Sequence, residues 1–241
     1  MHKLFLSAAV ALACAAAANA QNPTSSNDTS IRPARSRGDV GRSDPLFRRT
    51  VECVVERAGP RTRNLIATIP GTADEARIIS SFQSRLDWCF DAAEGGISFP
   101  WNVMRGGIAE VFYHRAFPAG LPATPATPSA AAATAWAQPR AAAFASSEGA
   151  QMEMLHSVAR CVVVRQPATV STLLAAAPLS AGEGAAMRTL QPDLSACLTS
   201  GITFTASRQS LRGLLAEAAL HYGEDANGGF VRVAQAPAAS D

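Results

Sequence analysis

Lysine is almost absent from this sequence, and the shortage limits the chemistry open to the chain. Its 241 residues include 21 basic ones, of which only Lys3 is a lysine. A Schiff-base mechanism and a phosphate-binding loop of the usual type both need a lysine, so neither is expected. Basic residues form no long run and the net charge is only +2. A nucleic-acid partner is therefore not expected.

Other motifs that carry chemistry are missing as well. The sequence has no G-x-S-x-G nucleophile motif and no glycine-rich phosphate loop. It has no C-x-x-C or C-x-x-H pair, which structural zinc sites usually contain. We therefore expect no cofactor and no metal.

The first 20 residues have the pattern of a secretory signal peptide. His2 and Lys3 precede an apolar run, residues 4–16, that is too short to span a bilayer. Ala18-Asn19-Ala20 has the small-x-small order of a cleavage site. Cleavage near Ala20 predicts a periplasmic or secreted chain with no transmembrane segment. A retained membrane helix and a lipid on Cys14 are the alternatives.

An internal repeat is the most informative feature of the sequence. Residues 50–90 align with residues 158–198 at a constant offset of 108, without a gap. After a small shift, the string R-G-x-x-A-E-x-x-x-H occurs at residues 105–114 and again at 212–221. This register indicates a duplicated unit.

Four cysteines fall within the repeat, two in each copy: Cys53, Cys89, Cys161 and Cys197. An even number in an exported chain indicates disulfides, and three pairings are possible. The repeat selects Cys53 with Cys89 and Cys161 with Cys197, because each unit then keeps one bridge.

The predicted fold is all-α, with two tandem four-helix units packed as a pseudo-twofold body. The expected helices are residues 44–58, 62–69, 72–90 and 102–115, then 149–165, 168–177, 181–198 and 207–222. Asp44 is expected to cap the first of them, with Pro45 at its first position. Thr72-x-x-Glu75 and Ser180-x-x-Glu183 are capping boxes that start the third and the seventh. We expect six segments along the chain: a signal peptide at 1–20, a disordered leader at 21–43, unit 1 at 44–115, an Ala/Pro-rich linker at 116–147, unit 2 at 148–223 and a flexible tail at 224–241. Trp136 and Phe144 are expected to fix the linker to a helical surface, and residues 230–233 are a weak candidate for a short strand.

The duplicated string supplies the candidate site residues. Glu110 and His114 lie four residues apart on one helix face, as do Glu217 and His221, and such pairs can act as acid and base or bind a metal. The alternative is a histidine that only interacts with the helix end.

The duplicated arginines are expected to form structural ion pairs. Arg57 would pair with Glu110 and Arg165 with Glu217, or Arg105 and Arg212 would be the partners of these two glutamates. Solvated surface charge is the alternative. Gly106 and Gly213 indicate close approach of two helices, with a gap for a ligand as the alternative.

The same residues carry a resemblance to a family. Cys161-Val162-Val163, Pro178, Ser180, Glu183, Cys197-Leu198 and the segment 211–217 form a pattern that resembles uncharacterised exported proteins of alphaproteobacteria, sphingomonad type. Unit 1 carries it less faithfully, with Met104 and Gly107 at two positions. The resemblance covers both units and implies export and the repeat. It implies no catalytic or binding residue.

These observations favour a non-enzymatic exported module with a protein or cell-envelope partner. The alternatives are a protein that binds a small ligand between the two units and, less favoured, a metal-dependent or acid/base hydrolase. An apolar pocket lined by both units would favour the ligand-binding alternative.

Overall fold

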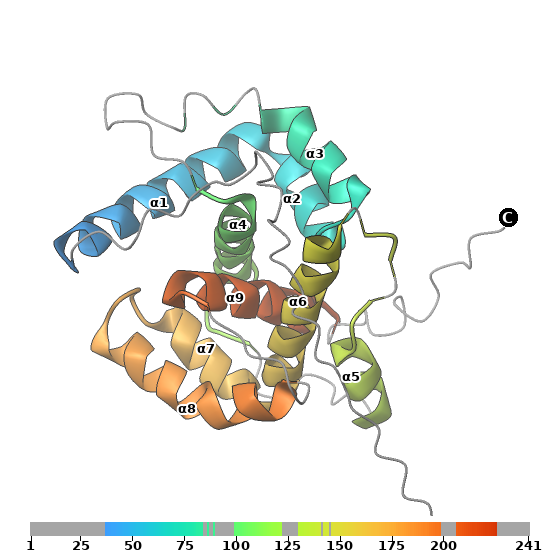
Figure 1. Cartoon of the computed structure of the whole chain (residues 1–241). Coiled ribbons are helices and arrows are strands. Elements are labelled where there is room, and N and C mark those ends of the chain that lie inside the picture. The colour runs from blue at the N-terminus through green and yellow to red at the C-terminus, as the bar shows by residue number, and fades with distance from the viewer. Residues whose placement is uncertain are drawn as a thin grey trace, which may run out of the picture. The chain divides into compact units, whose positions relative to one another are not determined.

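The computed structural model describes residues 37–83, 86, 89, 99–121, 130–140, 142–144, 146–198 and 206–225. These residues form nine α-helices and no β-strand (Figure 1), so the all-α prediction is confirmed. The expected signal peptide, Cys14 and residues 230–233 lie outside this range. No described helix is both long and apolar enough to cross a membrane.

The first half of the fold consists of α1 (Arg37–Ala58), α2 (Pro60–Ala67), α3 (Ala73–Gln83) and α4 (Trp101–Ala116). Two predicted boundaries are wrong. Helix α1 includes residues 37–43, which were expected in the leader, and Pro45 lies inside it. A proline removes one hydrogen bond but does not prevent the preceding turns from being helical.

Helix α3 ends at Gln83 rather than at residue 90. Beyond it, the Leu86 N–H donates to the Gln83 carbonyl and the Cys89 N–H donates to the Leu86 carbonyl. Each of these hydrogen bonds joins residues three apart rather than four, and Leu86 and Cys89 are both buried in the core.

The second half consists of α6 (Ser147–Arg165), α7 (Pro167–Ala175), α8 (Ala181–Cys197) and α9 (Arg208–Glu224), close to the predicted bounds. The Ala/Pro-rich linker expected at residues 116–147 was predicted without a helix, and this is wrong for its middle, where α5 (Ala130–Ala137) forms. This segment is mostly alanine, the best helix former, and its prolines Pro128 and Pro139 stand outside the helix.

Matching turns start α3 and α8. The Thr72 hydroxyl accepts from the Glu75 N–H, and the Ser180 hydroxyl accepts from the Glu183 N–H. Each glutamate also accepts a backbone N–H from the residue before its cap, at 2.6 Å from Gly71 and 2.8 Å from Leu179. These are the capping boxes that the sequence predicted.

Helices α4 and α9 cross near the middle of the described helices and make their main contact with each other (Figure 1). A Cβ atom added at Gly106 would lie 2.6 Å from the Cα of Gly213, so the two backbones touch where both residues are glycine. Around this crossing, one hydrophobic core joins side chains from both halves, including Leu65, Ile108, Val162, Leu173 and Leu215.

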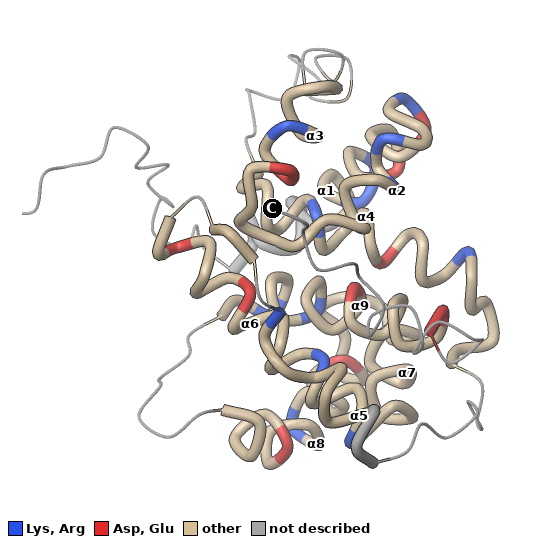
Figure 2. Tube along the Cα trace, turned by 90° about the vertical axis from the view of Figure 1, so that its right-hand side faces the viewer, with Lys and Arg blue, Asp and Glu red and all other residues tan. Residues whose placement is uncertain are grey.

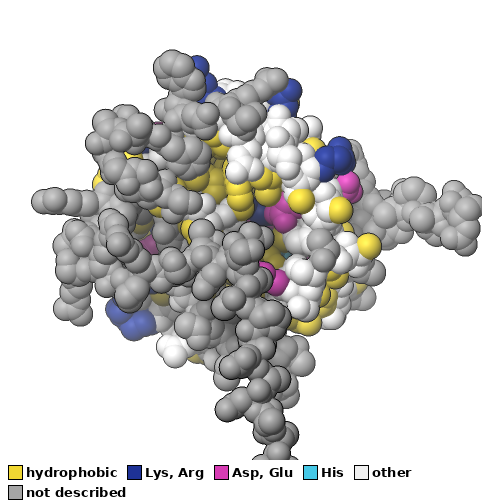
Figure 3. All heavy atoms as spheres, turned by 45° about the horizontal axis from the view of Figure 1, so that its top comes forward, with side chains coloured by type: hydrophobic (Ala, Val, Ile, Leu, Met, Phe, Trp, Pro, Cys, Tyr) yellow, Lys and Arg dark blue, Asp and Glu magenta, His cyan; other side chains and the backbone are white. Residues whose placement is uncertain are grey.

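Two disulfides join the pairs that the repeat selected, Cys53–Cys89 and Cys161–Cys197. Each bridge closes a loop with a sequence separation of 36 residues. Acidic and basic positions are mixed along the helices (Figure 2), and in the space-filling view acidic side chains lie among hydrophobic ones (Figure 3).

Candidate functional site

Arg105 on α4 and Glu217 on α9 form a buried ion pair at the helix crossing. Arg105 Nε donates to Glu217 Oε1 at 3.1 Å and to Oε2 at 2.9 Å, and Nη2 donates to Oε1 at 2.7 Å. Both side chains are only 2% exposed. The fork of the guanidinium therefore binds the carboxylate in a bidentate manner, out of contact with solvent.

Arg105 also reaches α2 and α3. Its Nη1 donates to Glu75 Oε1 at 2.8 Å, and its Nη2 donates to the carbonyls of Ile66 and Thr68 at 3.2 and 2.8 Å. These carbonyls lie at the C-terminal end of α2, where the helix dipole is negative and favours a cation. One buried cation thus ties α2, α3, α4 and α9 together.

Arg212 makes the corresponding contacts from the other helix: it lies on α9 and binds a glutamate on α4. It donates to both carboxylate oxygens of Glu110 on α4 at 2.7 to 3.1 Å. It also donates to Glu183 at 3.2 Å and to the carbonyls of Leu173 and Leu174 at the end of α7. Each arginine therefore binds the capping-box glutamate from its own half and the helical glutamate from the other half.

Of the two ion pairings expected from the sequence, the first, with Arg57 and Arg165, is wrong, and the second, with Arg105 and Arg212 as the partners, agrees with the structure. Arg57 is exposed, and Arg165 donates to Asp193 Oδ1 at 2.7 Å. Glu110 and Glu217 are instead bound by Arg212 and Arg105, which lie on the facing helices at the crossing. Glu75 and Glu183 were expected only as caps, although their equivalent places in the two copies were a signal of a further role.

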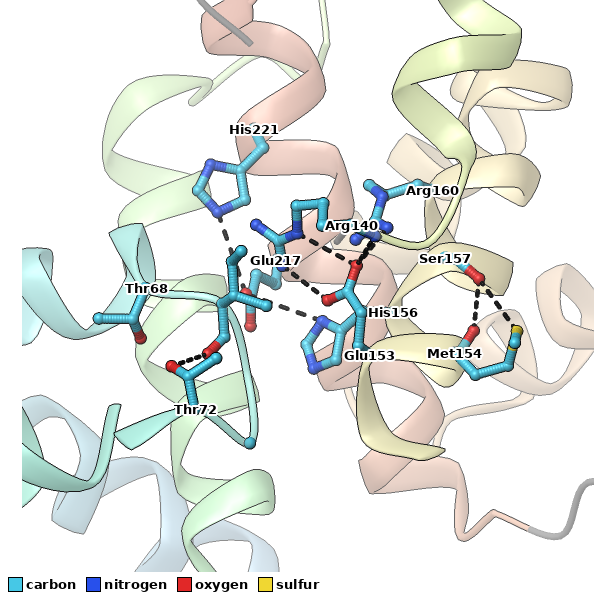
Figure 4. A network of polar contacts seen from close by, with 12 residues as sticks. Thr68, Thr72, Arg140, Glu153, Met154, His156, Ser157, Arg160, Glu217 and His221 are labelled. Atoms are coloured by element: carbon cyan, nitrogen blue, oxygen red, sulfur yellow. Dashed lines mark hydrogen bonds and ion pairs between the residues drawn. The ribbon is translucent and has the colours of Figure 1, made fainter. Parts of the chain in front are cut away.

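Two histidines approach one oxygen of Glu217, as Figure 4 shows. His156 Nδ1 on α6 lies 3.7 Å from Glu217 Oε1, and His221 Nε2 lies 3.9 Å from the same atom. His221 Nε2 is also 3.1 Å from the Ile66 carbonyl. In the other half His114 is exposed and lies 3.6 Å from Glu110. No sequence motif predicted His156 at this position.

The two helical glutamates are weak bases. Burial alone raises the pKa of Glu217, but Arg105 and His156 outweigh burial and lower it to about 2. Burial is likewise outweighed at Glu110, where His114 and Arg212 lower the pKa to about 2. Burial lowers the pKa of His156 to about 4, so this imidazole is neutral at pH 7. Within the described part of the chain, no three His, Cys, Asp or Glu side chains form a group that could hold a metal ion.

A second charge cluster fixes the strap, which we define as residues 130–140. The buried carboxylate of Glu153 on α6 accepts from Arg140 on the strap and from Arg160 on α6 (Figure 4). Arg160 also donates to the carbonyls of Trp136 and Gln138, at 3.1 and 2.7 Å. The Trp136 ring packs edge-on against Tyr222, with centroids 5.7 Å apart, so the strap is held against α6 and α9.

A cavity of about 870 Å³ lies among α2, the strap, α6 and α9. Its walls include Arg63 and Ile66 from the first half, Trp136 and Arg140 from the strap, and three almost fully buried polar side chains from α6 and α9: His156, Arg160 and Glu217. The volume is within the usual range of small-molecule sites.

The Glu110 side of the crossing has a much smaller cavity, of about 150 Å³. It is lined by Phe47, Val51 and Gly107 and by Leu179 between α7 and α8, with Glu110, His114 and Arg212 at its polar side.

Compared with known proteins, the chain matches no protein-family profile, no curated protein and no solved structure.

Proposed function

We propose that this chain is an exported, non-enzymatic protein that binds a small ligand in the cavity between its two halves. The observation that carries the proposal is the cavity of about 870 Å³, into which both halves and the strap contribute residues. Its wall places buried polar groups beside an indole ring. It is more polar than most small-molecule sites and than the apolar pocket expected from the sequence, so it suits a polar ligand. The two disulfides support an oxidising compartment outside the cytoplasm.

We also propose that the two halves are duplicated units related by pseudo-twofold symmetry about the α4–α9 crossing. The support is the exchange of partners there: Arg105 binds Glu217, and Arg212 binds Glu110. Equivalent residues in the alignment have equivalent partners, and Gly106 meets Gly213 at the crossing. Such a body places the interface between the halves where a ligand can contact both.

Catalysis by the Glu/His pairs is the less favoured function. A general base needs a pKa near the working pH, and both glutamates have a pKa of about 2. Each carboxylate is also occupied by an arginine. The same features suit a rigid binding wall, because the charges are fixed before a ligand arrives.

Ligand retention by the full chain tests the proposal. Native mass spectrometry of the protein, purified from an oxidising compartment, should show a bound small molecule. Ala67→Trp should abolish its retention, since Ala67 is exposed on α2 and lines the cavity. The matched control is Ala175→Trp, the aligned and exposed position on α7, which lines neither cavity described above. A ligand retained equally by both variants, or absent from the unaltered protein, contradicts the proposal.

A further inference from the structure

Two arginines share one carboxylate at the edge of the large cavity. Arg140 donates to Glu153 from Nε at 3.1 Å and from Nη2 at 2.9 Å, and Arg160 donates from Nη2 at 2.6 Å. Glu153 is 1% exposed and Arg160 only 8%. Two guanidinium groups share the Glu153 carboxylate, so the cluster of Arg140, Arg160 and Glu153 carries one positive charge more than Glu153 neutralises; Glu217, which also acts on Arg160, is already bound by Arg105.

Both arginines keep donors for a further acceptor. A guanidinium carries five N–H groups, two of them on Nη1. Neither Nη1 makes a hydrogen bond to any residue in the described part of the chain, and both arginines line the cavity. An oxyanion is the acceptor that matches two guanidinium groups best, because charge-assisted hydrogen bonds are short and strong.

Carboxylates elsewhere in the cavity wall already have donors from the protein. Arg105 binds Glu217, Arg63 binds Glu224, and the Trp136 indole N–H donates to Asp225 at 2.9 Å. His156, one helical turn before Arg160 on α6, is neutral at pH 7 because burial lowers its pKa. The Asp225 donor is neutral, so the wall as a whole has no excess of positive charge. Positive charge exceeds negative charge only in the cluster of Arg140, Arg160 and Glu153.

The two arginines come from different elements, Arg140 from the strap and Arg160 from α6, so one ligand could contact both. Arg160 is held in place by its bonds to the Trp136 and Gln138 carbonyls, whereas Arg140 belongs to the strap and its side chain is 27% exposed. Burial lowers the pKa of Arg160, and the charge of Arg140 lowers it further. A bound anion would offset both effects.

We infer that the cavity binds its ligand through an anionic group, a carboxylate or a phosphate, held between Arg140 and Arg160. This inference rests on the proposed function. It goes further by assigning the ligand class and the two residues that recognise it.

Calorimetric titration of the full chain with matched probes tests the inference. Benzoate, a dicarboxylate such as glutarate, inorganic phosphate and phenyl phosphate are the anions, and benzamide and benzylamine are the neutral and cationic counterparts. At least one anion should bind, and benzamide and benzylamine should bind more weakly than benzoate. Preference for the carboxylates or for the phosphates identifies which anionic group is recognised. Failure of all four anions to bind overturns the inference.

Substitutions locate the binding. Arg140→Gln should weaken anion binding about tenfold or more, because it removes one charge and leaves the Arg160–Glu153 pair balanced. Arg188→Gln, at an exposed position on α8, should leave binding unchanged. Equal binding by Arg140→Gln and the unaltered protein overturns the inference. A co-purifying ligand that is neutral or cationic, and is lost in Ala67→Trp but kept in Arg140→Gln, also overturns it while the proposed function stands. If the proposed function itself is wrong, the result differs: Ala67→Trp still retains the ligand.

Discussion

The two ends of the α4–α9 crossing contain the same parts in different surroundings. Arg105 and Glu217 are each 2% exposed, whereas Arg212 is 4% and Glu110 16% exposed. The further side chain beside each glutamate also differs. Arg48 Nη2 lies 3.8 Å from Glu110 Oε1, and His156 Nδ1 lies 3.7 Å from Glu217 Oε1. Arg48 and His156 are two residues before the aligned ranges, at the same offset of 108. A permanent cation at one end thus corresponds to a neutral imidazole at the other.

This difference agrees with the ligand site proposed at the Glu217 end. The Glu110 end has Arg48 and a small cavity, while the Glu217 end has His156 and borders the cavity of about 870 Å³. If the proposed function holds, the ion network at the Glu110 end serves the crossing alone, and the one at the Glu217 end also forms part of a binding site. The following predictions compare the two ends directly.

Removal of the helical glutamates should have the largest effect. Glu217→Ala leaves Arg105 buried without its main partner and should lower the free energy of unfolding by roughly 3–5 kcal/mol. Glu110→Ala should have a smaller effect, because Glu110 is more exposed and water can reach Arg212. Urea unfolding followed by circular dichroism measures both, with Glu148→Ala at an exposed position of α6 as the control. Equal effects of the two substitutions would remove the distinction between the ends.

The two disulfides should contribute nearly equally. Both loops have a sequence separation of 36 residues, for which loop entropy gives roughly 3–4 kcal/mol each. Cys53→Ser with Cys89→Ser, and Cys161→Ser with Cys197→Ser, should therefore lower the free energy of unfolding by similar amounts. Urea unfolding without reductant measures this. A clearly unequal result would show that the native contacts around one bridge, such as the turns at Leu86 and Cys89, dominate over loop entropy.

Local signals predicted most of the fold, and contacts across the fold were harder to predict. Capping boxes placed the starts of α3 and α8, and the repeat selected the disulfides. Proline at position 45 was expected to start a helix, but the turns before it are helical as well. The prolines of the linker concealed α5, whose alanines favour a helix. Arg105 and Arg212 were one of two expected sets of partners for Glu110 and Glu217, but the choice between the sets depends on how α4 crosses α9, which no spacing along one helix reveals.

The role of His156 was the least predictable feature of the site. It lies outside the duplicated string, and its neighbours in sequence give no motif. Only its alignment with Arg48, together with the position of α6 beside α9, places it at Glu217. Equivalent positions that differ in charge between the two halves were therefore the best available signal for the end where we propose the ligand site.

His156 should make stability depend on pH between about 6.5 and 4. Its pKa falls from an ordinary 6.5 to about 4 in the folded chain, mainly through burial, opposed by Glu217 and Glu153 and reinforced by Arg105 and Arg140. The unfolded chain therefore binds the proton more readily, and stability is lost as the pH falls through this range. The loss should reach about 3 kcal/mol at most.

Urea unfolding at pH 7, 5.5 and 4 measures this slope, and His156→Gln should reduce it. His221, whose pKa burial also lowers, contributes with the same sign, so the difference between the two proteins is the quantity to compare. At the other end Arg48 carries a permanent charge, and Arg48→Gln should leave the slope unchanged. An identical slope in His156→Gln would show that protonation of His156 does not cause the pH dependence of stability.

Leu179 should show the smallest effect, in a favourable direction. It has a φ of 62°, in the left-handed region, and is 42% exposed, whereas the aligned residue in the first half is Gly71 with a φ of 77°. A Cβ atom at Gly71 would lie 2.3 Å from the Cα of Gly149, so glycine is required there, but space remains around Leu179. Leu179→Gly relieves backbone strain of about 1–2 kcal/mol and gives part of it back through the greater freedom of glycine in the unfolded chain. Thermal unfolding should show a net gain of less than about 1 kcal/mol, and Leu179→Asn, which also tolerates this conformation, should fall between the two. A loss of stability in both variants would instead mean that the leucine side chain is needed at the wall of the small cavity, and that the Glu110 end also depends on its apolar lining.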